Sequence, residues 1–144
     1  MSRIEESVTV MRPEAEVFAY TTLAKNWPKW QSIVTKAEQT SQGPVGAGAT
    51  FGGMSCMMGV SMKWTAKVTE YDLGRKWAKT IAIGNMIISE QLIFEPVEGG
   101  TRFTIVYDIS AVGLMKLAAP MIVKSMQKET IKSLGNVKRI LEAN

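Results

Sequence analysis

Histidine is absent from the 144-residue sequence, and cysteine occurs only once, as Cys56. Histidine is the usual acid–base side chain near neutral pH and the commonest metal ligand. Its absence excludes Ser-His-Asp and Cys-His catalytic sites and most zinc sites, so we expect no metal and no cofactor. Any catalysis would depend on aspartate, glutamate, lysine, tyrosine or Cys56. A lone cysteine forms no internal disulfide, which favours a reducing, cytoplasmic location.

The sequence also lacks an apolar run of membrane-spanning length, and its charged N-terminal segment differs from a signal peptide. Seventeen Lys and Arg residues against 13 Asp and Glu residues give a net charge of only +4. No helix-turn-helix or aromatic RNA-binding pattern accompanies the basic residues, so we expect no nucleic-acid partner. The glycines within residues 43–48 have the wrong spacing for a phosphate-binding loop, which argues against a nucleotide site.

What the sequence does contain is a succession of strand patterns between two helical regions. Alternating or β-branched segments predict strands at residues 4–11, 33–39, 50–57, 60–71, 76–83, 86–95 and 101–110. Two short helices are expected after the first strand, one opened by Pro13 and one that starts near Asn26 and is limited by Pro28. From Gly113 onward, residues at steps of three and four predict one long amphipathic helix whose Pro120 would kink it or delay its start. Its expected inner stripe is Met115, Ala119, Ile122, Met126, Thr130, Ser133, Val137, Ile140 and Leu141.

A two-residue loop, Gly84-Asn85, predicts a hairpin with a type II′ turn, and this fixes the pairing of the flanking strands. The expected pairs are Ile83 with Met86, Ile81 with Ile88, Lys79 with Glu90, and Trp77 with Leu92. The next loop allows Phe94 opposite Phe103, then Leu92 opposite Ile105 and Glu90 opposite Tyr107. Lys79, Glu90 and Tyr107 would therefore form a row on an apolar face. If that face lines a cavity, they could orient a ligand; the alternative is a solvated ion pair at the sheet mouth.

Several segments, in this order, resemble the SRPBCC superfamily and within it the polyketide cyclase/dehydrase and lipid-transport group, which is related to START and birch-pollen-allergen-like proteins. The segments are residues 13–20, 27–30, 43–48, 64–71, 94–103 and the closing helix. The resemblance implies a single α+β domain over residues 1–144 with the helix-grip fold. In that fold a curved antiparallel sheet of six or seven strands wraps a long C-terminal helix, two short helices follow the first strand, and a cavity lies between sheet and helix.

The resemblance and the polar row lead to three hypotheses. The first is a carrier or sensor for a lipid, polyketide or similar hydrophobic ligand, acting as a monomer or weak homodimer. Its expected ligand-binding residues are Met62, Trp64, Trp77, Lys79, Glu90, Leu92, Ile105, Tyr107, Ala119, Ile122 and Met126. The second is a cyclase, aromatase or dehydratase in which Glu90 acts as base and Tyr107 or Lys79 stabilises an oxyanion. The third is a protein-interaction module without a ligand.

Methionine and lysine are distributed unevenly. Ten methionines are present, and they cluster at positions 54, 57, 58 and 62 and in the last helix at 115, 121 and 126. Methionine suits deformable apolar surfaces, so these clusters indicate either ordinary core packing or an adaptable pocket wall. Lys124, Lys128 and Lys132 share the face of the last helix that lies opposite its apolar stripe. That face is expected to be solvated, with a membrane-surface role as the alternative.

Overall fold

The computed structural model describes residues 2–143. Over these residues the chain forms seven strands, three α-helices and one 3-10 turn in the order that the sequence predicts. The strands are β1 (Ser2–Val10), β2 (Val34–Gln39), β3 (Thr50–Met57), β4 (Val60–Asp72), β5 (Lys76–Ile83), β6 (Met86–Val97) and β7 (Gly100–Ala111). The helices are α1 (Glu14–Thr22), η1 (Ala24–Asn26), α2 (Trp27–Trp30) and α3 (Met115–Glu142).

All seven strands belong to one antiparallel sheet with the order β1-β7-β6-β5-β4-β3-β2. The β5–β6 hairpin has the predicted register, with Lys79 opposite Glu90. Gly84 has a φ of 56° and Asn85 is not among the residues with positive φ, as a type II′ turn requires. The β6–β7 register that the next loop allows is also confirmed, because Glu90 pairs with Tyr107.

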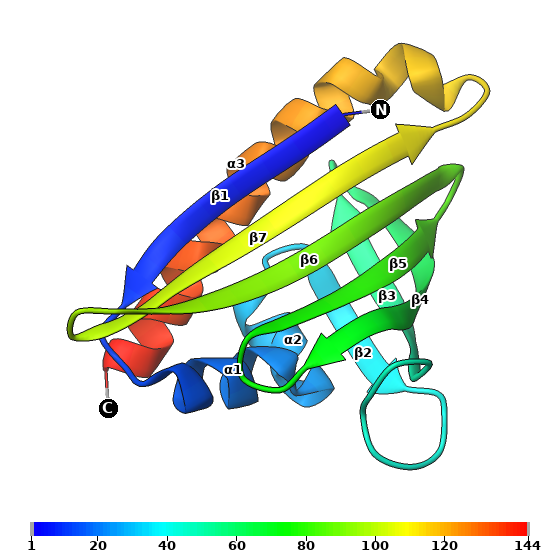
Figure 1. Cartoon of the computed structure of the whole chain (residues 1–144). Helices are drawn as coiled ribbons and strands as arrows, with labels where there is room; N and C mark the ends of the chain where they lie inside the picture. The colour runs from blue at the N-terminus through cyan, green and yellow to red at the C-terminus, as the bar shows by residue number, and fades with distance from the viewer. Residues whose placement is uncertain (1, 144) are drawn as a thin grey trace.

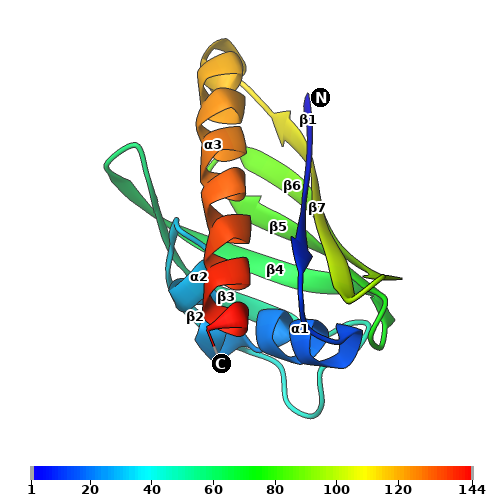
Figure 2. The ribbon, with the colours of Figure 1, turned by 90° about the vertical axis from the view of Figure 1, so that its left-hand side faces the viewer.

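Helix α3 lies across the concave side of the curved sheet and follows β1 and β7, while α1 and α2 close one end (Figure 1 and Figure 2). Its buried side chains are Ile122, Met126, Thr130, Ser133, Leu134 and Val137, which follow the predicted stripe except for Leu134. The helix continues through Pro120 rather than starting after it. This arrangement confirms the predicted helix-grip fold.

The start of β2 differs from the expectation. Simple alternation places Ile33, Thr35 and Ala37 on one face, but the register with β3 shifts between Val34 and Lys36 and leaves Thr35 exposed. The two strands approach closely here, since a Cβ added to Gly53 would lie 1.9 Å from the Lys36 carbonyl oxygen. Only glycine fits such an approach, so the bulge depends on a neighbouring strand that sequence alternation alone does not reveal.

The end of the concave face beside α1 and α2 is filled with aromatic side chains. The Trp27 ring lies 5.0 Å from that of Phe51 and 5.8 Å from that of Trp77, measured between ring centroids. Pro28 lies in the first turn of α2, where its missing N–H costs nothing, so it helps to start this helix rather than limiting it. The short helix thus delivers Trp27 to the core. The remaining space on the concave face lies further along α3.

Candidate ligand cavity

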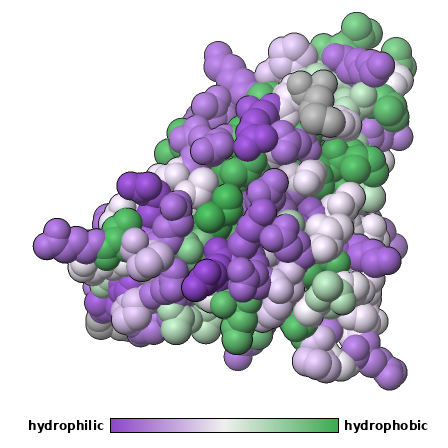
Figure 3. Space-filling view, viewed as in Figure 1, coloured by the Kyte–Doolittle hydropathy of each residue, from purple (hydrophilic) through white to green (hydrophobic). Residues whose placement is uncertain are grey.

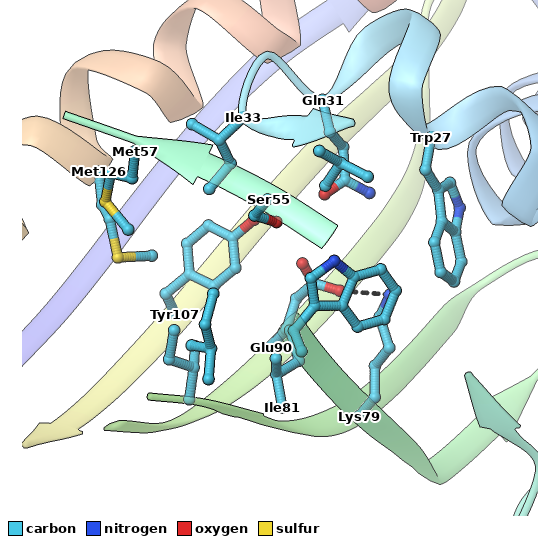
Figure 4. A pocket seen from close by; sticks show the side chains of 14 residues that line it. Trp27, Gln31, Ile33, Ser55, Met57, Lys79, Ile81, Glu90, Tyr107 and Met126 are labelled. Carbon is cyan, nitrogen blue, oxygen red and sulfur yellow. Dashed lines mark ion pairs between the residues drawn. The ribbon is translucent and has the colours of Figure 1, made fainter. Parts of the chain in front are cut away.

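A narrow cavity of about 50 Å³ lies between the sheet and α3. Its walls come from α2 and the loop after it, from β2 to β7, and from α3. The lining residues are Trp27, Gln31, Ile33, Val34, Ser55, Met57, Trp64, Lys79, Ile81, Ile83, Ile88, Glu90, Tyr107 and Met126. Figure 4 shows the two methionines at one end of this space and Trp27 at the other, with Ser55 and Tyr107 facing one another. The cavity has room for roughly four water molecules at 10–15 Å³ each.

An ion pair between Lys79 and Glu90 lies in the wall of this cavity. Their Nζ and Oε1 atoms are 3.1 Å apart, and the two residues are only 3% and 1% exposed. They are held opposite one another on β5 and β6 by the hairpin register. Removing two charges from water is costly, so a pair this deeply buried persists only where both charges are compensated. The alternative of a solvated pair at the sheet mouth is therefore wrong.

The Lys79 ammonium group is further enclosed by two indole rings. Its Nζ atom lies 3.7 Å from the Trp27 ring centroid and 4.9 Å from that of Trp77. A desolvated cation over an indole face gains about 2 kcal/mol. Burial lowers the pKa of Lys79, and the negative charge of Glu90 opposes that change. Trp27 therefore has two roles, as a member of the aromatic core and as a partner of the buried cation.

Tyr107 is the third polar group of the row. Burial raises the pKa of Tyr107 well above its ordinary value, and the charge and hydrogen-bonding capacity of the Glu90 carboxylate act in the same direction. Its hydroxyl group is therefore protonated and available as a donor at any physiological pH. The row as a whole combines a carboxylate, an ammonium ion and a neutral phenol inside a largely apolar wall.

Two buried polar atoms of the wall residues have no hydrogen-bond partner within the described part of the chain: Trp64 Nε1 and Glu90 Oε1. Oε1 is also the atom that forms the ion pair with Lys79 Nζ at 3.1 Å, so its charge is compensated. Unpaired buried donors and acceptors are rare because each costs about 1–3 kcal/mol. Trp64 Nε1 is thus a buried donor without a partner among the described residues, whereas Glu90 Oε1 already contacts the Lys79 ammonium group.

Next to this cavity, a second space of about 20 Å³ lies between α3 and the loop after α2; it shares four lining residues with the first. A group of hydrogen bonds crosses the gap here. The Ser32 hydroxyl donates to the Glu129 carboxylate, and the Ser32 backbone N–H donates to the Ser133 hydroxyl oxygen at 3.0 Å. Asn136 donates to the Trp30 carbonyl oxygen at 3.2 Å. These contacts hold the loop against the helix beside the cavity.

The structure brings five of the predicted ligand-binding residues together in the cavity wall: Trp64, Lys79, Glu90, Tyr107 and Met126. The other six lie elsewhere. Trp77, Leu92, Ile105 and Ile122 are buried in the core, and Met62 and Ala119 are partly buried outside the wall. Trp77, Leu92 and Ile105 are cross-strand neighbours in one row, and Ile122 lies on α3, but none of the four borders the cavity.

Several wall residues were absent from the prediction. Ile81 and Ile88 form the cross-strand pair next to Lys79 and Glu90, so the same register that revealed the ion pair could have identified them. Met57 belongs to the methionine cluster for which a pocket wall was one alternative, but Gln31 and Ser55 carry no sequence signal. They reach the cavity because the loop after α2 and strand β3 lie across from β6 and β7, and only the tertiary fold brings these segments together.

The fold and the cavity define a helix-grip protein with a polar row inside an apolar pocket. The sequence matches the family described as polyketide cyclase/dehydrase and lipid transport over residues 1–142, so the chain belongs to this family. No curated protein matches the sequence. Among residues 2–143, no helix combines the length and apolar character needed to cross a membrane.

Solved structures with the same fold are numerous and distant in sequence. The protein TTHA0849 from Thermus thermophilus superposes with a TM-score of 0.83 at 16% identity, covering 99% of this chain and 98% of that one. The Zhui aromatase/cyclase from Streptomyces sp. R1128 gives 0.79 at 16% identity, covering 98% and 93%. Ara h 8.0201 gives 0.77 at 17% identity, covering 99% of both chains. At such identities the likeness establishes the fold.

Proposed function

We propose that this protein is a carrier or sensor that binds a compact hydrophobic ligand in the cavity between the sheet and α3. The observation that carries the proposal is the polar row of Lys79, Glu90 and Tyr107 in the wall of an otherwise apolar cavity. A ligand with one hydroxyl or carbonyl group would hydrogen-bond to this row, while its apolar body would contact the isoleucine and methionine side chains. Membership of a family described by lipid transport supports the same class of function.

The size and charge of the cavity narrow the ligand class. A space of about 50 Å³ is far smaller than the 300–1,000 Å³ typical of drug-sized ligands. A long-chain lipid would therefore require Met57 and Met126 to move, and methionine side chains adapt readily. Lys79 and Glu90 neutralise one another, so the wall offers no net charge for an ionic ligand. A small neutral molecule with one polar group fits these constraints best, and a ligand with a ring system would also require the two methionines to move.

Native mass spectrometry of the protein purified from cells tests this proposal. An adduct that is released on denaturation would identify the ligand, and its mass and fragmentation would show whether it is aromatic or aliphatic. A bare protein that stays bare after incubation with mixed lipid and polyketide extracts would contradict the carrier function. That outcome would favour a protein-interaction module instead.

A cavity-filling variant locates the binding site. Ser55→Leu adds apolar volume inside the wall and should abolish the adduct or weaken binding by at least about tenfold, since one clashing or displaced contact is worth about 1.4 kcal/mol or more. Ser89→Leu makes the same change on β6, at a half-buried position outside the cavity wall, and is the matched control. Equal binding by both variants and the unchanged protein would exclude this cavity as the site.

A second candidate function is enzymatic, and the buried carboxylate beside a protonated phenol favours it. In a cyclase or dehydratase, Glu90 would accept a proton from a carbon next to a carbonyl group. The Tyr107 hydroxyl or the Lys79 ammonium group would then stabilise the resulting enolate oxygen. A fold shared with an aromatase/cyclase is compatible with this chemistry but does not establish it.

Hydrogen–deuterium exchange at the acidic carbon of an aryl β-diketone, followed by NMR, tests for this activity. Exchange catalysed by the protein and abolished by Glu90→Gln would support the enzyme. Binding of the same probe without catalysed exchange would support the carrier. Glu90→Gln also removes one partner of the buried ion pair, so a circular dichroism spectrum of the variant must show that it is folded.

A further inference from the structure

The outward face of the N-terminal two-thirds of α3 carries exposed apolar and basic residues and no acidic residue. This outer α3 face consists of Leu114 at the helix start and Leu117, Met121, Lys124, Lys128, Ile131 and Lys132. Leu114 and Leu117 are 84% and 83% exposed, and Met121 is 66% exposed. Large apolar side chains with this degree of exposure, gathered on one surface, mark a site of interaction.

Helix geometry explains why these residues form one surface. At 100° per residue, Leu117, Met121, Lys124 and Lys128 project within a sector of about 60°. The buried side chains Ile122, Met126 and Val137 project on the opposite side, against the sheet. The helix is therefore amphipathic in two senses: its inner face belongs to the core and the cavity wall, and its outer face combines apolar groups with positive charge.

The acidic residues of the surrounding sequence do not reach this face. No aspartate or glutamate occurs between Asp108 and Glu129. Glu129 points towards the loop after α2, where it accepts a hydrogen bond from Ser32. The three lysines therefore act on the outer α3 face without a neutralising carboxylate from their own segment. Figure 3 shows hydrophobic residues interspersed with hydrophilic ones at the upper right, the end of the molecule where α3 begins.

We propose that the outer α3 face docks the protein onto the surface of an anionic lipid bilayer. Leu114, Leu117 and Met121 enter the boundary between headgroups and acyl chains, and the lysines contact lipid phosphates. Interfacial helices combine apolar side chains with lysine in this way. Each lysine near an anionic membrane surface adds attraction, so the positive charge complements this occupant in particular.

The same charges argue against a second copy of this chain as the occupant. Two outer α3 faces packed together would bring six lysines, three from each copy, into one interface without compensating acidic groups. Docking on a membrane does not depend on the identity or existence of a ligand in the cavity. If a ligand is carried, docking would bring α3, which also contributes Met126 to the cavity wall, to the bilayer surface.

Co-sedimentation of the full chain with lipid vesicles tests the proposal. Vesicles of phosphatidylcholine alone are compared with vesicles of phosphatidylcholine mixed with phosphatidylglycerol, each at low and at high salt. We expect binding to the mixed vesicles only, weakened by salt because screening reduces the attraction between lysines and phosphates. Failure to bind the mixed vesicles at low salt would overturn the proposal.

Two pairs of variants separate the outer α3 face from general surface properties. Lys124→Glu/Lys128→Glu should weaken vesicle binding at least about tenfold. Its control, Lys25→Glu/Lys29→Glu, makes the same charge change on exposed residues of η1 and α2 and should leave binding unchanged. Leu117→Ser/Met121→Ser should also weaken vesicle binding. Its control, Leu73→Ser, removes an apolar side chain that is 74% exposed in the turn before β5 and should leave binding unchanged. All targeted side chains are exposed, so folding should not change.

The outcomes distinguish membrane docking from general surface properties and from dimerisation. Loss of vesicle binding in both α3 variants, with the controls unchanged, supports the proposal. Equal losses in variants and controls would show that binding follows net charge or hydrophobicity alone and would overturn it. Concentration-dependent dimerisation in analytical ultracentrifugation that Leu117→Ser/Met121→Ser abolishes would assign the face to a second copy instead. None of these outcomes depends on the cavity, so the ligand proposal is tested separately.

Discussion

The two ends of the concave face differ in what fills them. Beside α1 and α2, the rings of Trp27, Phe51 and Trp77 contact one another, and neither Phe51 nor Trp77 lines the cavity. Further along α3, isoleucine and methionine side chains surround the cavity and the buried Lys79–Glu90 pair. The same sheet and the same helix bound both ends. Side-chain volume at a few positions, rather than the backbone fold, therefore decides where this protein has a pocket.

The largest expected effect comes from emptying the filled end. Trp77→Ala should lower the free energy of unfolding by about 3–5 kcal/mol, because a fully buried indole is replaced by a void. Met126→Ala at the cavity end should cost about 2 kcal/mol. Urea denaturation of both variants measures the difference. Equal losses would mean that the two ends are packed alike, contrary to the comparison drawn above.

Breaking the buried ion pair should be nearly as costly. Lys79→Met leaves Glu90 in the core without its partner, and we expect a loss of about 3 kcal/mol in the free energy of unfolding. The double variant Lys79→Met/Glu90→Gln removes both charges and should recover much of that loss. A double-mutant cycle measured by urea denaturation gives the coupling energy. Additive single effects would show that the two side chains do not interact.

A smaller effect is expected where the loop after α2 meets α3. Ser32→Ala removes the hydroxyl that donates to Glu129 and should lower the free energy of unfolding by about 1 kcal/mol. If this contact restrains entry to the cavity, stopped-flow tryptophan fluorescence should show faster association of a bound ligand. Ser89→Ala on β6 is the control. A Ser32→Ala variant with unchanged stability would show that the loop is held by its other contacts.

The smallest expected effect is a change in stability at alkaline pH. The pKa of Tyr107 is raised above its unfolded value near 10.0, so the folded protein holds this proton where the unfolded chain releases it. The contribution of Tyr107 to stability is complete below about pH 10 and is lost as the pH rises towards the folded pKa. The lowered pKa of Lys79 changes stability with pH in the opposite direction. The contribution of Tyr107 is therefore measured by comparing the unchanged protein with Tyr107→Phe.

Tyr107 should ionise only as the protein unfolds. An absorbance titration of tyrosinate tests this expectation, because the signal that appears on unfolding should be smaller by one tyrosine in Tyr107→Phe. The stability of this variant should also fall less steeply above about pH 10 than that of the unchanged protein. Ionisation of Tyr107 before unfolding, together with the half-buried Tyr20 and Tyr71, would show that its hydroxyl group is accessible to water.

The sequence by itself determined the element order and the strand registers around the candidate site. Gly84-Asn85 selected a tight hairpin, and strict two-residue alternation then placed Lys79, Glu90 and Tyr107 in one row across β5, β6 and β7. The apolar period of α3 likewise followed from helix geometry, apart from Leu134. These are local properties, because turn type and side-chain direction depend on residues close together in the chain.

Only the tertiary structure decided which residues border empty space. Trp64 lines the cavity and Trp77 does not, although both lie on inward-facing strand positions. Trp27 became a partner of Lys79 because α2 brings it over β5, and Ser55 faces Tyr107 because the sheet curves round α3 (Figure 4). Such contacts join segments far apart in the chain, and a void is the space that all of their side chains together leave unfilled.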